Sequence, residues 1–204
     1  MIPALQEKVS PFLRIDTPTL AAASAVGILK QEPDHHNSKQ IIGQLLESDD
    51  PARLCTTIGF FLQSGHLLAK ESVLRFLDHP SYQVRNEILA VLDPHHDVDF
   101  LDPIIKTLAY ATTFDHANAA LNHYDPSLIL DRFTYFLFAT DSSIHLKLGI
   151  LKTAHEFSSD DMTELLSSGL DDPDLLILDG ISDALVKISK IHELHQTVLD
   201  AIEI

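Results

Sequence analysis

The stretch FLDHPSYQVRNEILAVL, residues 76–92, determines the predicted fold. Its centre, Asp78-His79-Pro80, predicts a tight turn, because proline cannot continue the preceding helix and favours the start of the next one. After the turn, Val84, Ile88 and Val91 recur at the spacing of one face of an α-helix. The stretch therefore predicts a helical hairpin. A hairpin this short cannot bury its apolar faces alone, so we expect the chain to repeat it.

The same apolar stripe recurs along the chain at intervals of about 31 residues, within the range of helical solenoid repeats. The other stripes are Ala22/Val26/Leu29, Leu54/Ile58/Phe61, Ala117/Leu121/Tyr124, Ile144/Leu148/Leu151 and Ile177/Ile181/Ala184. A turn signal precedes most of them. These signals are Asp16-Thr17-Pro18, Asp50-Pro51, Asp141-Ser142-Ser143 and Asp172-Pro173.

This pattern predicts an all-α chain. Between the helices, the polar segment Glu32–Ser38 is expected to form a loop. The expected helices are Pro3–Leu13, Pro18–Lys30, Lys39–Glu47, Pro51–Gln63, His66–Leu77, Ser81–Leu92, Val98–Tyr110 (beginning near Phe100 or Leu101), Thr112–Tyr124, Ser127–Ala139, Ser142–Glu156, Asp160–Leu170 and Pro173–Ile188. A separate terminal helix, Ser189–Ile204, is expected to cap the apolar side of the last hairpin.

The turn Asp78-His79-Pro80 followed by Val84-Arg85 resembles the HEAT-type repeat, particularly its shorter bacterial form. In period and turn placement the resemblance covers nearly the whole chain. It implies a right-handed α-solenoid of about six hairpins, with residues 1–204 forming a single domain and the C-terminal helix capping it. In that family the turn aspartate and the helix arginine often form a ladder between repeats. Here the arginine position is Leu178 in the last repeat and Ala23 in the first.

The chain is acidic, with 30 acidic and 14 basic residues and a formal net charge of −16. Phosphate backbones would be repelled, so no nucleic-acid partner is expected, whereas a basic protein partner is electrostatically favoured. The alternative is that the acidity serves solubility alone, as in many intracellular bacterial proteins.

The single cysteine, Cys55, excludes an internal disulfide and a multi-cysteine zinc site, and it is expected to be a small core residue. Residues 1–30 lack a basic n-region followed by an apolar run, and no run of about 20 apolar residues occurs. We therefore expect a cytoplasmic protein that does not bind membranes.

Twelve histidines offer candidate metal ligands. Two pairs, His35-His36 and His95-His96, fall in expected loops, where solvated side chains are the simpler interpretation. HEAT-like di-iron hydroxylases hold their metal with His-Glu pairs on repeat helices. Only His155-Glu156 and His192-Glu193 match that pair here, whereas four would be needed. We expect no resident metal or other cofactor.

Catalytic motifs are absent: the sequence contains no G-x-S-x-G elbow, Walker loop or G-x-G-x-x-G. Two interpretations of the aromatic stretch Phe133–Phe138 stay open, a helix buried on several sides or an exposed binding patch. Asp179 and Asp183 are spaced i, i+4 on an expected second helix, the kind that lines the concave side of such repeats. Two interpretations of this aspartate pair stay open: a solvated helix face or an acidic binding surface. HEAT-like DNA glycosylases need a basic groove, so that activity is not expected.

The sequence thus predicts a non-catalytic protein-interaction scaffold or adaptor with a concave acidic surface. Glu87, Asp179 and Asp183 are the predicted binding residues. Two alternatives stay open. One is an acidic inhibitor or immunity protein that neutralises a basic toxin or nuclease, and the other is a histidine-dependent metalloenzyme resembling the di-iron hydroxylases. The partner's identity and the oligomeric state are not fixed by the sequence.

Overall fold

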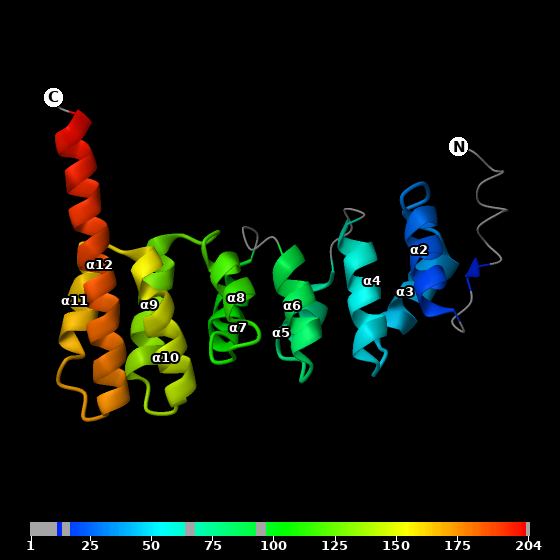
Figure 1. The fold of residues 1–204 in the computed structure, drawn as a ribbon. Coiled ribbons are helices and arrows are strands. Elements are labelled where there is room, and N and C mark those ends of the chain that lie inside the picture. Colours follow the sequence, from blue (N-terminus) through cyan, green and yellow to red (C-terminus); the bar gives the residue numbers. More distant parts are fainter. Residues whose placement is uncertain (1–11, 14–16, 64–67, 93–96, 203–204) are drawn as a thin grey trace. The chain divides into compact units, whose positions relative to one another are not determined.

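The computed structural model describes residues 12–13, 17–63, 68–92 and 97–202, without the side chains of residues 63 and 194–202. These residues form helices and connecting turns, with no strand among them (Figure 1), so the prediction of an all-α chain is confirmed for them. The helix predicted for Pro3–Leu13 lies outside the described residues, apart from its last two positions. The helices are α2 (Pro18–Leu29), α3 (His36–Leu46), α4 (Pro51–Gln63), α5 (Lys70–Leu77), α6 (Tyr82–Val91), α7 (Leu101–Thr107), α8 (Phe114–Leu121), α9 (Pro126–Phe138), α10 (Ile144–Thr153), α11 (Asp160–Ser168) and α12 (Leu175–Ile202), with 3₁₀ turns η3 (Val98–Phe100) and η4 (Ala154–Phe157).

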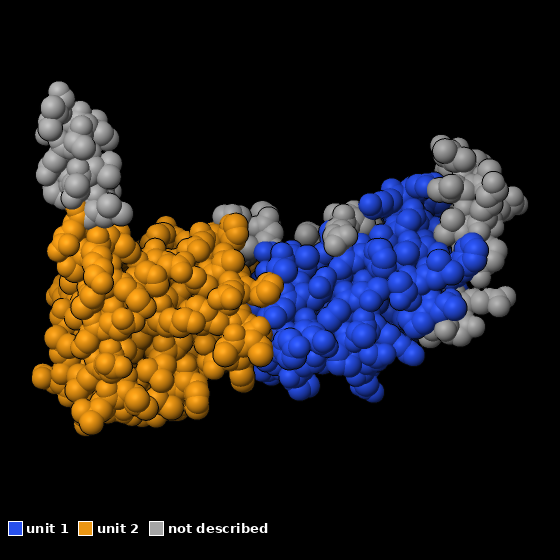
Figure 2. All heavy atoms as spheres, in the orientation of Figure 1, with its two compact units in different colours: residues 1–92 blue, residues 93–204 orange. Residues whose placement is uncertain are grey.

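The chain divides into two compact units, residues 1–92 and residues 93–204 (Figure 2). The division separates the charge. The first unit has 10 acidic and 8 basic residues, and the second has 20 acidic and 6 basic residues. The second unit therefore contributes 14 of the 16 net negative charges. That the whole chain forms a single domain stays a prediction.

In the first unit, each second helix of a hairpin packs against the next one. α2 contacts α3 and α4, and α4 in turn contacts α6. The small side chains Ala21, Ala22 and Ala25 are completely buried, which lets the backbones of these helices approach closely. The contacts follow the predicted stripes, because Leu54, Ile58, Val84 and Ile88 are all buried.

The turn between α5 and α6 is held by Arg85, the arginine of the Val84-Arg85 motif. Its side chain turns back and donates hydrogen bonds from Nη1 to the carbonyl oxygens of His79 (2.6 Å) and Pro80 (3.0 Å). Carbonyl groups in a turn lack intrahelical partners, so a charged donor there is favourable. Arg85 thus closes its own hairpin through backbone oxygens.

In the second unit, the hairpins α7–α8, α9–α10 and α11–α12 pack around a core that includes Phe133, Ile150 and Ile181. α10 contacts both α7 and α12. Gly149 of α10 lies directly against the end of α7: a Cβ atom there would be 2.4 Å from the backbone oxygen of Leu108. The absence of a side chain at Gly149 therefore lets the two segments meet.

Two arginines link first helices of successive hairpins, one in each unit. Arg75 Nη1 donates to Glu47 Oε2 at 2.7 Å, and its guanidinium lies 4.9 Å from the ring centroid of Phe76. Arg132 Nε donates to Asp102 Oδ1 at 2.6 Å and its Nη2 donates to Oδ2, so this pair is bidentate. These bridges span 28 and 30 residues, close to one repeat, but they use positions other than the turn aspartate and helix arginine of the HEAT motif.

Several local predictions are wrong, among them the start of α5, which begins at Lys70, and the length of α8, which spans Phe114–Leu121. The separate terminal helix from Ser189 does not form; α12 runs unbroken from Leu175 to Ile202 (Figure 1), because neither glycine nor proline occurs between Ile181 and Ile202, where the break was predicted. Of the predicted stripe Ile144/Leu148/Leu151, only Leu151 is buried. Ile144 and Leu148 are half-buried, and the other buried positions of α10 are Leu146, Gly149, Ile150 and Thr153. The predicted loop Glu32–Ser38 ends early, because α3 begins at His36.

The N-cap of α9 gives a pH-dependent prediction. Asp125 Oδ1 accepts hydrogen bonds from the Ser127 hydroxyl (2.6 Å) and the Ser127 backbone N–H (2.8 Å), and these bonds lower the pKa of the Asp125 carboxyl from its ordinary value of 3.8. A lowered folded-state pKa stabilises the fold above that ordinary value, and the contribution disappears as pH falls through the lowered pKa. Asp125→Ala should reduce the melting temperature at pH 7, and the difference from wild type should vanish in acid.

Thermal unfolding followed by circular dichroism between pH 2 and pH 7 measures this effect. The matched control is Asp131→Ala, at an exposed position of the same helix. A gap between Asp125→Ala and wild type that stays constant down to pH 2 would show that the charge of Asp125 plays no part in capping.

Candidate functional site

The three predicted binding residues fall in both units. Glu87 is in the first unit, and its half-buried side chain lies over α4, where a Cβ atom added to Gly59 would be 2.6 Å from Glu87 Oε1. Burial raises the pKa of the neighbouring Cys55 thiol, and the charge of Glu87 raises it further. Cys55 is half-buried. A thiol with a raised pKa stays protonated and is a poor nucleophile.

Asp179 and Asp183 are both exposed on α12 in the second unit, one helical turn apart. They differ in their surroundings. Asp183 Oδ2 forms an ion pair with Lys187 Nζ at 2.7 Å, and this hydrogen bond lowers the pKa of Asp183; the positive charges of Lys187, His155 and Lys190 act in the same direction. Asp179 forms no ion pair or hydrogen bond with the described residues. The charge of Asp179 is therefore not offset by a partner among the described residues.

Large apolar side chains surround these carboxylates on α12. Leu175 is 78% exposed, Leu176 60% and Val186 51%. Leu175, Asp179 and Val186 are spaced i, i+4, i+11 and lie on one face of the helix, opposite the buried Ile177, Ile181, Ala184 and Ile188. We call Leu175, Leu176, Asp179, Asp183 and Val186 the α12 face. An apolar surface surrounding charged groups is typical of an interaction site.

Three of the described histidines, His35, His79 and His155, form local hydrogen bonds through Nδ1. His35 is the N-cap of α3, with Nδ1 accepting from the Ser38 backbone N–H at 3.2 Å. In the pair His155-Glu156, the carboxylate of Glu156 accepts hydrogen bonds from the side chains of Asn118 (2.6 Å) and Asn122 (3.4 Å), which link α8 to η4.

No group of three or more His, Cys, Asp or Glu side chains in the described part of the chain could hold a metal ion. His95-His96 lies outside the described residues, and His192-Glu193 is exposed on α12.

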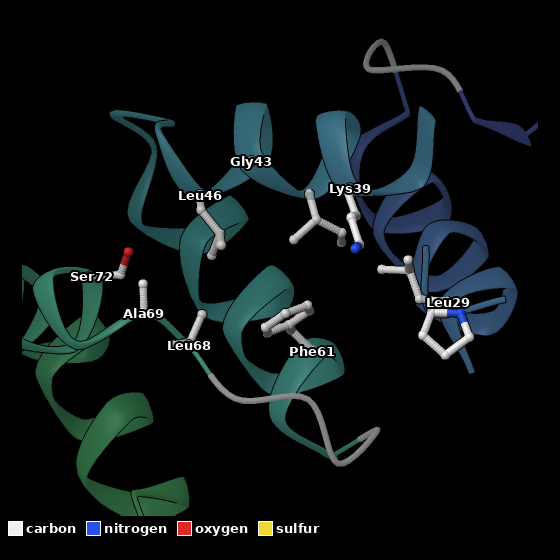
Figure 3. A pocket seen from close by; sticks show the side chains of 10 residues that line it. Leu29, Lys39, Gly43, Leu46, Phe61, Leu68, Ala69 and Ser72 are labelled. Atoms are coloured by element: carbon white, nitrogen blue, oxygen red, sulfur yellow. The ribbon is translucent and has the colours of Figure 1, made fainter. Parts of the chain in front are cut away.

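The first unit contains a pocket of about 310 Å³ between α2, α3, α4 and the start of α5 (Figure 3). Its walls are mainly apolar and include Leu29, Ile42, Leu46 and Phe61, and Lys39 lies at its edge. The polar side chains among its described lining residues are those of Lys39 and Ser72.

Sequence reasoning found Asp179 and Asp183 from their i, i+4 spacing but missed the apolar residues beside them. Leu175, Leu176 and Val186 lie outside the predicted stripe Ile177/Ile181/Ala184, and the sequence pattern gave them no role. Their exposure follows from their place on α12, away from the buried Ile177, Ile181, Ala184 and Ile188. The pocket in the first unit has no signal in the sequence, because residues from four separate segments line it.

The aromatic stretch fits neither of its two interpretations alone. Phe133 and Phe136 are buried, with Phe133 in edge-to-face contact with Phe157, whereas Tyr135 and Phe138 are about half exposed. The Arg132 guanidinium lies 4.8 Å from the Tyr135 ring centroid, so part of the exposed aromatic surface supports the arginine bridge to Asp102.

No protein-family model matches this sequence, and no curated protein matches it either. Among the helices of the described residues, none is both long enough and apolar enough to cross a lipid bilayer.

Proposed function

We propose that this chain is a non-catalytic helical-repeat protein that binds a basic protein partner through the α12 face of its second unit. The observation that carries the proposal is the combination on one helix face of exposed Leu175 and Val186 with the carboxylate of Asp179, which pairs with no described residue. Acidic groups speed the encounter with a basic partner, and apolar side chains supply surface that is buried on binding.

The charge distribution supports the same assignment. Fourteen of the sixteen net negative charges belong to the second unit, so its field would attract cationic proteins at long range. Glu87 is not included in the proposed surface, because its side chain packs over α4.

The HEAT-like solenoid is part of this proposal. Three observations support it: the packing of α4 against α2 and α6, the packing of α10 against α12, and the arginine bridges at nearly one repeat length. In such an array the second helices line the concave side, where α12 would present its acidic residues.

The test is capture of a protein from a native lysate by the immobilised chain, followed by affinity measurement with the purified partner. Asp179→Lys should weaken binding about tenfold, the equivalent of ~1.4 kcal/mol. Asp183→Lys should weaken it less, because Lys187 already offsets the charge of Asp183. Raising the salt concentration should weaken the wild-type complex.

Asp49→Lys is the matched control, since it reverses an exposed charge in the first unit. Equal affinity of wild type and the Asp179→Lys/Asp183→Lys double variant, with helical content unchanged, would remove the α12 face as the binding site.

A further inference from the structure

The pocket in the first unit has the volume and the apolar lining that are typical of a site for a small molecule. Its volume of about 310 Å³ falls at the lower end of the ~300–1,000 Å³ found for ligand pockets. Leu29 of α2, Ile42 and Leu46 of α3, and Phe61 of α4 supply apolar walls from three helices, as Figure 3 shows for the labelled Leu29, Leu46 and Phe61. Such walls favour an apolar chain or ring.

Gly43 forms part of the pocket wall. It lies inside α3 and lines the pocket, and a Cβ atom added there would meet no atom within 4 Å. Glycine lowers helix stability relative to alanine, and here no packing contact requires it. Gly43 is exposed at the wall of the pocket, so a larger side chain has room there to extend over the pocket.

Among the described residues that line the pocket, Lys39 carries the one charged side chain. Figure 3 shows it on the same helix as Gly43, with its nitrogen on the side of the pocket. Lys39 Nζ pairs with Asp34 Oδ1 at 2.7 Å, but the Asp34 side chain is 99% exposed. Exposed ion pairs contribute little, so a ligand carboxylate can replace Asp34 at small cost.

We propose that the first unit binds a small organic acid with an apolar chain or ring, its apolar part beside Gly43 and its carboxylate on Lys39. This site is separate from the α12 face and does not depend on the proposed protein partner.

The experiment titrates the full chain with octanoate and with 1-octanol, which share an apolar chain and differ in charge, and follows backbone amides by two-dimensional NMR. Octanoate should cause saturable shifts at Ile42, Gly43 and Phe61. Gly43→Leu should weaken octanoate binding at least about tenfold by filling the pocket. Gly27→Leu is the matched control: Gly27 is also a helix glycine with no atom near its added Cβ, but it does not line the pocket.

Variants at the charged pair test the carboxylate. Lys39→Met should weaken octanoate about two- to fivefold and leave octanol unchanged, while Asp34→Asn should tighten octanoate only. The absence of saturable shifts, or equal binding by wild type and Gly43→Leu, would overturn the site. If octanol binds as tightly as octanoate and Lys39→Met changes neither, the assignment to an acid is overturned.

Discussion

Replacing Phe133 with alanine is expected to lower the free energy of unfolding of the second unit by about 4 kcal/mol. The Phe133 ring is completely buried in α9, and it packs edge-to-face on Phe157 with the ring centroids 5.8 Å apart. Its removal would take away the transfer energy of a whole ring and leave a cavity that the surrounding helices cannot close. Urea unfolding followed by circular dichroism measures the loss.

Phe138→Ala is the matched control for this prediction, since it makes the same chemical change on the same helix. The Phe138 side chain is 52% exposed, so its loss should cost about 1 kcal/mol or less. Equal destabilisation by the two variants would mean that Phe133 is not a core residue.

The Gly149→Ala variant is expected to destabilise the second unit by about 2 kcal/mol. Two effects oppose each other. Alanine favours the helix over glycine by about 1 kcal/mol. Against this, the new Cβ would lie 2.4 Å from the backbone oxygen of Leu108, and overpacking of this kind costs about 3 kcal/mol. The second effect is larger, because a backbone carbonyl cannot move without shifting α7 or α10.

The variant Gly59→Ala separates the gain in helix propensity from the cost of overpacking. Its Cβ would also meet an atom closely, at 2.6 Å, but this atom is the end of the flexible Glu87 side chain. The carboxylate can rotate away, so we expect Gly59→Ala to be neutral or slightly stabilising in the same urea measurement. A Gly149→Ala variant as stable as wild type would contradict the close approach of α10 to Leu108.

The helices could be predicted from the sequence wherever a turn signal and an apolar stripe agreed. The helix Pro51–Gln63 was predicted with its observed bounds, and α9 within one residue at each end. Prediction failed where a stripe had two possible phases. In α10, Ile144/Leu148 and Leu146/Ile150 are both apolar pairs, and only packing on α12 and α7 decides which is buried.

The end of the chain shows a second limit. Ser189 and its neighbours carry no helix-breaking signal, and a break was expected only because a repeat array needs a cap. Because the sequence near Ser189 contains no helix breaker, α12 continues through this position.

The candidate binding surface was predictable in part. The spacing of Asp179 and Asp183 indicated the helix face, but the apolar residues around them could not be assigned as exposed without the path of α12. The unequal charge of the two units can be counted from the sequence, but only after the structure has shown that the units divide near residue 92. Glu87 could not be judged from sequence, because its position over Gly59 depends on the contact between α4 and α6.

Carboxylate footprinting of the complex tests the proposed α12 face most directly. The chain would be labelled with a carbodiimide and an amine, alone and with its purified partner, and each modified residue quantified by mass spectrometry. We predict that Asp179 and Asp183 lose reactivity when the partner is bound, while Asp49 in the first unit keeps its own. Unchanged labelling of Asp179 and Asp183 in a saturated complex would contradict binding through the α12 face.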